Sequence, residues 1–276
     1  MAWEIVVTYR DFLLAKQRGQ IQGSLPHMSI ISSGSAAMAI QTQLAYYHLP
    51  SLKVLVDSQI APAICTTLEN LGCEVYKTDL TKKPLSWQDI LLMTNNRDGF
   101  DITSGDALDP TTRFYDWLSY EIINTSPDYC FLPFGTGNLY ENLLNINRRE
   151  VTSRNHDRRF SGNVDVLRNC NFLGATTSNP QSKADKLYSP HLPFVHLDEQ
   201  WSRLYRHAGY CGPLSNVYTT KENLLAKAMR LAESQGITCE PSGIAGLALL
   251  LQMKDQVPAT KKILIVNTGK AKLQAA

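Results

Sequence analysis

The 276-residue sequence predicts an α/β protein built on mostly parallel sheets. Short apolar runs alternate along the chain with longer segments of helical periodicity, which is typical of parallel strands joined by crossover helices. The composition, 43% hydrophobic and 19% charged, lets a chain of this length bury the core of one large or two ordinary domains. We therefore expect a doubly wound fold with two α/β lobes, residues 1–124 and 125–276.

The N-terminal lobe is predicted to contain three strands and their helices. Apolar runs at 28–33, 53–57 and 73–79 are typical of buried strands. Helical patterns are expected near residues 10–16, at 36–48, at 62–72 and at 110–123. Gly72 is expected to end the helix that precedes the third strand, because glycine readily takes the left-handed conformation found after a helix.

The same alternation continues in the C-terminal lobe. Strands are predicted at 129–134, 171–177 and 261–267, and helices after the turn at 135–137, at 220–236 and at 243–254. Outside the predicted strand at 171–177, residues 145–200 are mostly polar. Their arginines alternate with Glu150 and Asp157, which favours a solvated loop over a phosphate-binding patch. A proline separates His191 from His196, which argues against a metal pair on one helix, so no metal site is predicted.

Charge and cysteine spacing limit the function classes. Lysine and arginine total 27 against 25 acidic residues, a net charge of +2, so a nucleic-acid or membrane-surface binder is not expected. The partner expected is a small neutral or zwitterionic molecule. The six cysteines are never closer than eight residues apart, which excludes a CxxC metal knuckle and favours reduced thiols in the cytoplasm. The longest apolar stretch, 242–253, is too short to span a bilayer.

Three junctions that contain glycine follow predicted strands, and each could face an anion or a flat ring. "SSGSAAMAI" at 32–40 places hydroxyls and a glycine at a helix N-terminus, where unpaired amides favour negative charge. An ordinary serine N-cap would explain that segment equally well. "PFGTGNLYE" at 133–141 has two glycines, which let backbone amides approach a ligand. "VNTGKAKL" at 266–273 lies at the strand end where ligands collect in open sheets.

In this order the segments resemble the fold type II pyridoxal-phosphate enzymes, the group of tryptophan synthase beta chain and cysteine synthase, and most of all threonine synthase. The resemblance runs from Thr8 to Leu273 and includes "PTTRFYDWLSYEI" and "CEPSGIAGLALL". It implies pyridoxal phosphate as cofactor, a small amino-acid-like ligand and a homodimer. It also implies site residues: Gly135, Thr136, Gly137, Asn138 and Leu139 for the phosphate, Ser35 and Thr268 for the ring, and Ser32, Ser33 and Gly34 for the substrate.

One segment departs from the family pattern. "TYRDF" at 8–12 is similar to the family's Schiff-base motif, but Arg10 stands at the lysine position and Phe12 replaces an arginine. A guanidinium stays protonated and has no lone pair with which to attack an aldehyde. Lys16 would point away from the face of residue 10, and Lys270 would lie near the ring nitrogen, so neither is expected to replace the missing amine.

Two further departures fall on the same lobe. Ser35 replaces the asparagine that the family uses at the ring oxygen, and the chain is expected to be N-terminally shortened relative to the family. Three functions follow. The chain is a threonine-synthase-like lyase or synthase, impaired by the loss of the lysine; or it is a non-catalytic pseudoenzyme that binds a ligand or partner; or it is a fragment completed by another chain. Fold alone does not choose among them.

Overall fold

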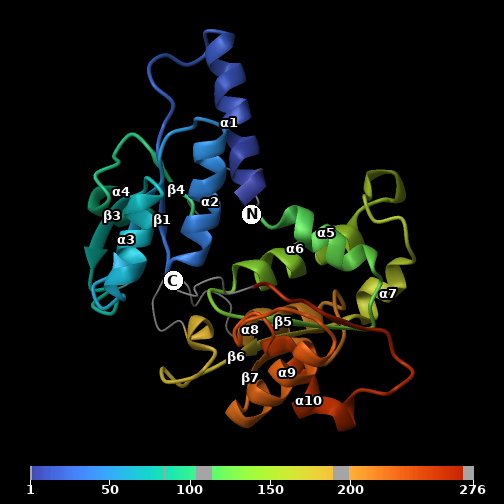
Figure 1. The fold of residues 1–276 in the computed structure, drawn as a ribbon. Coiled ribbons are helices and arrows are strands. Elements are labelled where there is room, and N and C mark those ends of the chain that lie inside the picture. Colours follow the sequence, from blue (N-terminus) through green and yellow to red (C-terminus); the bar gives the residue numbers. More distant parts are fainter. Residues whose placement is uncertain (1, 84, 104–113, 189–198, 270–276) are drawn as a thin grey trace. The chain divides into compact units, whose positions relative to one another are not determined.

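The computed structural model describes residues 2–83, 85–103, 114–188 and 199–269, and its described part contains two compact units that divide between Tyr115 and Asp116 (Figure 1). Each unit has its own four-stranded sheet. The predicted α/β fold with mostly parallel sheets is confirmed, since every strand pair is parallel. The division at 124/125 stays a prediction from the sequence. In the structure, the helix that ends at Asn124 lies in the second unit and packs against another helix of that unit.

The first unit is a doubly wound sheet in the order β3-β2-β1-β4. Its strands are β1 (Met28–Ile31), β2 (Lys53–Asp57), β3 (Glu74–Thr78) and β4 (Phe100–Asp101). Its helices are α1 (Ala2–Gln17), α2 (Ser35–Tyr46), α3 (Pro62–Asn70) and α4 (Trp87–Met93). The predicted strands and the first three predicted helices of this region are therefore present. The helix predicted at 110–123 begins at Asp116 and belongs to the second unit, and its residues 110–113 lie outside the described residues.

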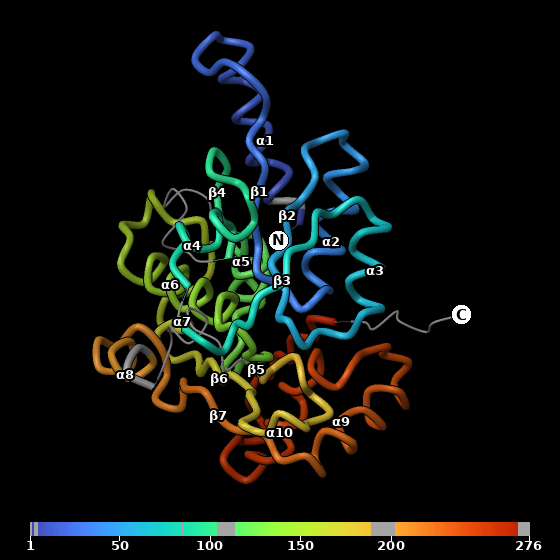
Figure 2. The backbone as a smooth tube through the Cα atoms, turned by 90° about the vertical axis from the view of Figure 1, so that its left-hand side faces the viewer, coloured from blue at the N-terminus to red at the C-terminus, as the bar shows by residue number. Residues whose placement is uncertain are grey.

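Alternate residues of the central strands face opposite layers of the first unit. Ile30 and Val54 join a core with α1, α2 and α3, whereas Ile31 and Leu55 join a second cluster with Ile90 of α4. Figure 2 shows α2 and α3 on one side of these strands and α4 on the other. Burial on both faces explains why these strands are continuously apolar in sequence.

The second unit repeats the plan in the order β7-β6-β5-β8. Its strands are β5 (Tyr129–Pro133), β6 (Asn171–Thr176), β7 (Asn216–Thr219) and β8 (Ile263–Ile265). Its helices are α5 (Asp116–Asn124), α6 (Asn138–Thr152), α7 (Val164–Asn169), α8 (Glu199–His207), α9 (Glu222–Ser234) and α10 (Ala245–Met253). Short 3-10 helices occupy Asn155–Asp157, Asp185–Leu187 and Lys254–Gln256. Figure 1 shows α9 and α10 on one side of this sheet and α5 and α6 on the other.

The polar middle of the chain corrects one expectation. Glu150 is not solvated, because its side chain is fully buried at the end of α6. One of its oxygens accepts a hydrogen bond from the Tyr120 hydroxyl at 2.6 Å, and the other accepts the backbone amides of Arg159 and Phe160 at 3.0 Å each. Burial, and then the Glu150 carboxylate, raise the pKa of Tyr120 to about 12. Glu150 therefore holds the segment after α6 against α5. His191 and His196 lie outside the described residues.

All six cysteines are described and each is a free thiol. Among the described helices, none combines the length and apolarity needed to cross a membrane.

Candidate functional site

The turn between β5 and α6 is the strongest candidate for an anion site. It begins at Phe134, whose amide donates to Ala175 O at 2.8 Å, and it ends at Gly137, which is the N-cap of α6. No side chain caps this helix, and no hydrogen bond between described residues uses the amides of Gly135, Thr136 or Gly137. Unused amides at the N-terminus of a 15-residue helix, together with its dipole, favour a bound anion.

The two glycines of this turn serve different purposes. Gly137 has φ of 85°, a left-handed conformation that side chains other than glycine rarely adopt. Gly135 has no such φ, but a Cβ there would lie 2.8 Å from the backbone oxygen of Lys186. The sequence suggested that both glycines admit a ligand. In the structure, the missing side chain at Gly135 also lets the Asp185–Leu187 helix pack directly against the turn, so this helix lies beside the turn.

The other predicted site residues of the turn differ in exposure. Thr136 is exposed, whereas Leu139 is 9% exposed and belongs to the core. Leu139 could therefore meet a phosphate only through its backbone amide. Asn138, the first residue of α6, is half-buried. The turn as a whole presents backbone and one threonine side chain to its surroundings.

Thr268 lies at the same edge of the second sheet. Strand β8 pairs with β5 in parallel, with Ile265 opposite Phe131, so both strands end at one edge. The chain continues through Val266, whose amide donates to Phe131 O at 2.9 Å, to Thr268, whose amide donates to Gly243 O at 3.3 Å. Thr268 is exposed. The structure thus brings the phosphate turn and Thr268 to adjacent strand ends.

An ion pair joins the surroundings of these two strand ends. Lys186 Nζ lies 2.6 Å from Glu240 Oε2, and the side chains are 34% and 13% exposed. Glu240 donates its amide to Gly269 O at 3.2 Å, and its Oε1 would be 2.5 Å from a Cβ at Gly269. The segment around Glu240 belongs to the resemblance but has no role predicted from the sequence, and no sequence signal singles out Lys186. No local pattern could have paired residues 54 positions apart.

The serine-glycine loop belongs to the first unit, between β1 and α2. Ser33 and Ser35 are exposed and Ser32 is half-buried. The Ser32 hydroxyl accepts hydrogen bonds from the amides of Gly34 at 3.1 Å and Ala37 at 3.4 Å. The N-cap of α2 is Gly34 rather than a serine, and its φ of 125° is suited to glycine. Ser32 therefore occupies two amides of this helix start, while Ser33 and Ser35 project outward.

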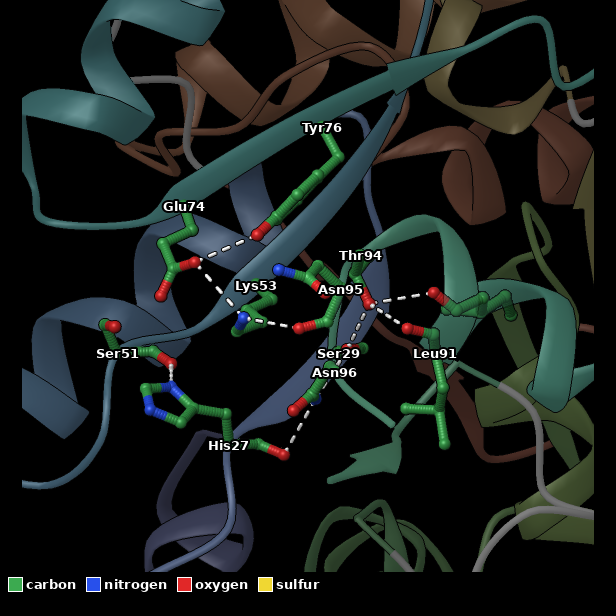
Figure 3. Close-up of polar contacts among 11 residues, drawn as sticks. His27, Ser29, Ser51, Lys53, Glu74, Tyr76, Leu91, Thr94, Asn95 and Asn96 are labelled. Carbon is green, nitrogen blue, oxygen red and sulfur yellow. Dashed lines mark hydrogen bonds and ion pairs between the residues drawn. The ribbon is translucent and has the colours of Figure 1, made fainter. Parts of the chain in front are cut away.

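A buried polar network anchors the strand that carries this loop (Figure 3). Ser29 of β1 is fully buried, and its hydroxyl lies 2.7 Å from Thr94 Oγ1. Asn96 Nδ2 donates to the same hydroxyl at 2.8 Å and to His27 O at 3.0 Å. The loop after α4 is thereby tied to β1, three residues before Ser32.

The same close-up shows a lysine held at the start of β2. Lys53, 8% exposed, donates to Asn95 O at 2.9 Å and lies 3.2 Å from Glu74 Oε2. Partial burial would raise the pKa of Glu74, but hydrogen bonds from Tyr76 and Lys53, with the Lys53 charge, outweigh it and lower the pKa. Because Lys53 and Glu74 begin their strands, this cluster lies at the amino edge of the sheet, opposite the serine-glycine loop. It supports the sheet rather than the candidate site.

Arg10 lies in the middle of α1 and points to solvent. Its side chain is 67% exposed and its Nη2 lies 3.2 Å from Asp11 Oδ1. The neighbouring Tyr9 faces the core and donates its hydroxyl to Pro26 O at 2.7 Å. Lys16, near the end of the same helix, donates to Gly23 O at 2.6 Å. Lys270 lies outside the described residues.

Within the described part of the chain, no group of three or more histidine, cysteine, aspartate or glutamate side chains could hold a metal ion. The groups found at the two strand ends are backbone amides, the Thr136 and Thr268 hydroxyls and one ion pair. That donor set fits a phosphate ester, because amides and hydroxyls can donate to its oxygens without further cations.

Two doubly wound units, with glycine turns at strand ends, define the fold of the type II pyridoxal-phosphate enzymes. The profile of the pyridoxal-phosphate dependent enzyme family matches residues 13–269. The chain belongs to this family, as the sequence predicted, and pyridoxal phosphate is the family's cofactor. Arg10 lies just outside the matched residues, so its assignment to the lysine position stays a prediction.

Individual relatives agree with the family. A threonine synthase of Synechocystis sp. is 26% identical over 154 residues, which is 54% of this chain and 38% of that protein. The match therefore spans well under half of that relative. Among solved structures, a threonine deaminase of T.th. has a TM-score of 0.62 at 15% identity, over 92% of this chain and 80% of that one. An O-ureido-L-serine synthase has a TM-score of 0.60 at 14% identity, over 97% and 78%. At such identities the solved structures support the fold.

Proposed function

We propose that the chain binds pyridoxal phosphate non-covalently, with the phosphate against Gly135, Thr136, Gly137, Asn138 and Leu139. The observation that carries this proposal is the uncapped start of α6, where the amides of residues 135–137 have no partner among the described residues. Thr268 would face the ring nitrogen from the neighbouring strand end. A hydroxyl there leaves the pyridine unprotonated, whereas a carboxylate would protonate it.

We propose an amino-acid-like ligand for the first unit. Ser32, Ser33 and Gly34 would meet its carboxylate, and Ser35 would face the ring oxygen. The hydroxyl of Ser32 already accepts hydrogen bonds from the amides of Gly34 and of Ala37 in α2, so its proposed contribution is to fix the loop against the start of that helix, while Ser33 and Ser35 are exposed. When bound, pyridoxal phosphate supplies an electron sink for lyase and synthase chemistry at the α-carbon of an amino acid.

Arg10 sets the limit on catalysis. If residue 10 occupies the lysine position, the chain has no amine there, and a guanidinium has no lone pair with which to attack an aldehyde. The chain would then be a threonine-synthase-like protein with impaired lyase or synthase activity. The second candidate function, a non-catalytic binder of the same ligand, is favoured by the exposure of Arg10 and its pairing with Asp11.

Thr136 offers the cleanest test of the phosphate turn. Its side chain is exposed, so a substitution there should leave packing intact, unlike a side chain at Gly135. Thr136→Asp places a carboxylate beside the proposed phosphate, and Thr136→Asn is the uncharged control of similar shape. A unit charge about 6 Å from a dianion in water costs about 1.4 kcal/mol, or about tenfold in affinity.

The measurement is calorimetric titration with pyridoxal phosphate at low ionic strength, where screening is weak. We expect Thr136→Asp to bind about tenfold more weakly than Thr136→Asn, because the two variants differ only in the charge of the side chain. Equal affinity of all three proteins would place the phosphate elsewhere. Absence of binding to a folded wild type would remove the cofactor proposal for this chain.

A further inference from the structure

We propose that the Lys186–Glu240 ion pair sets the spacing between the phosphate turn and the Thr268 end of the site. Both would then be positioning residues for a ligand that carries a phosphate and a ring. This inference rests on the proposed function, because it takes those two strand ends as the two ends of one cofactor site.

On the lysine side, the backbone is fixed against the phosphate turn. A Cβ at Gly135 would lie 2.8 Å from Lys186 O and 3.8 Å from Leu187 Cα, so the two segments are in direct contact. Leu187 belongs to the core of the second unit, and its carbonyl accepts the Thr176 hydroxyl at 3.3 Å. A shift of residue 186 would therefore be transmitted to the turn.

On the glutamate side, the backbone is fixed against the segment that follows β8. Glu240 N donates to Gly269 O at 3.2 Å, and Ile244 N donates to Glu240 O at 3.0 Å. A Cβ at Gly243 would lie 2.8 Å from Gly269 N. These contacts hold the Glu240 carboxylate beside Gly269, directly next to Thr268.

The ion pair closes the gap between these two fixed segments. At 2.6 Å it is a short charge-assisted contact, and the carboxylate is only 13% exposed. Exposed ion pairs contribute little to stability, but the attraction within a pair is screened less when one of its partners is mostly buried. Loss of the pair would let the Asp185–Leu187 helix move away from Glu240, and the turn would move with it.

A positioning role for the ion pair and a direct charge effect on the ligand predict different affinities in single variants of the pair. Lys186→Met removes a positive charge and Glu240→Gln removes a negative one, so a direct charge effect on an anionic ligand would change affinity in opposite directions. Loss of spacing would weaken binding in both variants. A pair worth about 1 kcal/mol corresponds to about a fivefold change in affinity.

The experiment titrates pyridoxal phosphate into the wild type, Lys186→Met, Glu240→Gln and Lys186→Met/Glu240→Gln. Lys186→Arg can keep the pair, and Lys183→Met removes an exposed charge three residues away as a matched control. We expect both single variants to bind about fivefold more weakly, the double variant to lose no more than either, and both Lys186→Arg and Lys183→Met to match the wild type. Circular dichroism confirms folding of each protein.

Opposite shifts in the two single variants, or affinities equal to that of Lys183→Met, would overturn the positioning role. In both cases wild-type binding would leave the proposed function intact. If the folded wild type does not bind pyridoxal phosphate, the proposed function and the positioning role fall together.

Discussion

A single methyl group at Gly135 tests the contact between the phosphate turn and the segment around Lys186. The added Cβ would lie 2.8 Å from Lys186 O, a distance that real Cβ atoms essentially never show. The obstructing atom belongs to the backbone, so no side-chain rotation can relieve the clash. Either the turn or the Asp185–Leu187 helix must move.

The expected cost of Gly135→Ala follows from this geometry. Overpacking by one methyl group lowers the free energy of unfolding by about 1–3 kcal/mol. The lower conformational entropy of the unfolded chain with alanine raises it by about 0.4–1 kcal/mol. Since Gly135 has no positive φ, backbone strain adds nothing. We expect a net loss of about 1–2 kcal/mol, or about 2–8 °C in Tm for a unit of this size.

The assay is thermal and urea unfolding followed by circular dichroism, with Thr136→Ala as the control one residue away. The control side chain is exposed, so its variant should unfold within about 0.5 kcal/mol of the wild type. Gly135→Ala should also weaken pyridoxal phosphate binding, because the turn is displaced. A Gly135→Ala protein as stable as the control would refute the close contact with Lys186.

Two predictions concern the first unit. Asn96→Ala removes one donor from His27 O, which keeps the Phe100 amide at 3.2 Å, and one from the buried Ser29 hydroxyl, which keeps its contact with Thr94. Two lost hydrogen bonds of about 0.5–1.5 kcal/mol each predict a loss of about 1–3 kcal/mol in urea unfolding; a change below about 0.5 kcal/mol would mean that the network does not anchor β1. At α4, hydrogen bonds from the Ser86 amide and hydroxyl lower the pKa of Asp89 to about 2. A lowered pKa stabilises the fold above the usual aspartate range, and this stability is lost as pH falls towards 2. Ser86→Ala should cost about 1 kcal/mol near neutral pH and reduce, without abolishing, the loss of stability between about pH 4 and pH 2, because the amide of residue 86 still donates to Asp89; an unchanged acid profile would contradict the contribution of the Ser86 hydroxyl.

The strands were predictable where burial on both faces leaves an unbroken apolar run. The run at 53–57 matches β2 in both bounds, because residues on each side of that strand meet a covering layer. Strand β7, "NVYT", was missed because its residues are half-buried or exposed and it carries no such run. Helix α4 was also missed, although its Ser86–Asp89 capping box was a readable sequence signal.

The candidate site was predictable only where its chemistry is local. The glycine turn before α6 could be recognised because strand, glycines and helix are consecutive in sequence. The packing that requires a glycine at position 135 could not be predicted, because Lys186 comes close to it only in the folded protein. The same limit hid the Lys186–Glu240 pair and the burial of Glu150, whose three hydrogen-bond partners come from α5 and from the segment after α6.

The central claim is that this chain binds pyridoxal phosphate without a covalent bond to a lysine. Mass spectrometry of one sample under native and then denaturing conditions, after incubation with the cofactor and borohydride, tests it most directly. Arg10→Lys serves as the positive control, because it supplies an amine at the proposed lysine position. We predict one cofactor per wild-type chain in the native spectrum and none after denaturation, whereas Arg10→Lys keeps the cofactor at residue 10. A wild type that keeps the cofactor after denaturation, on Lys16, Lys186 or another lysine, or that carries none under native conditions, would contradict the account.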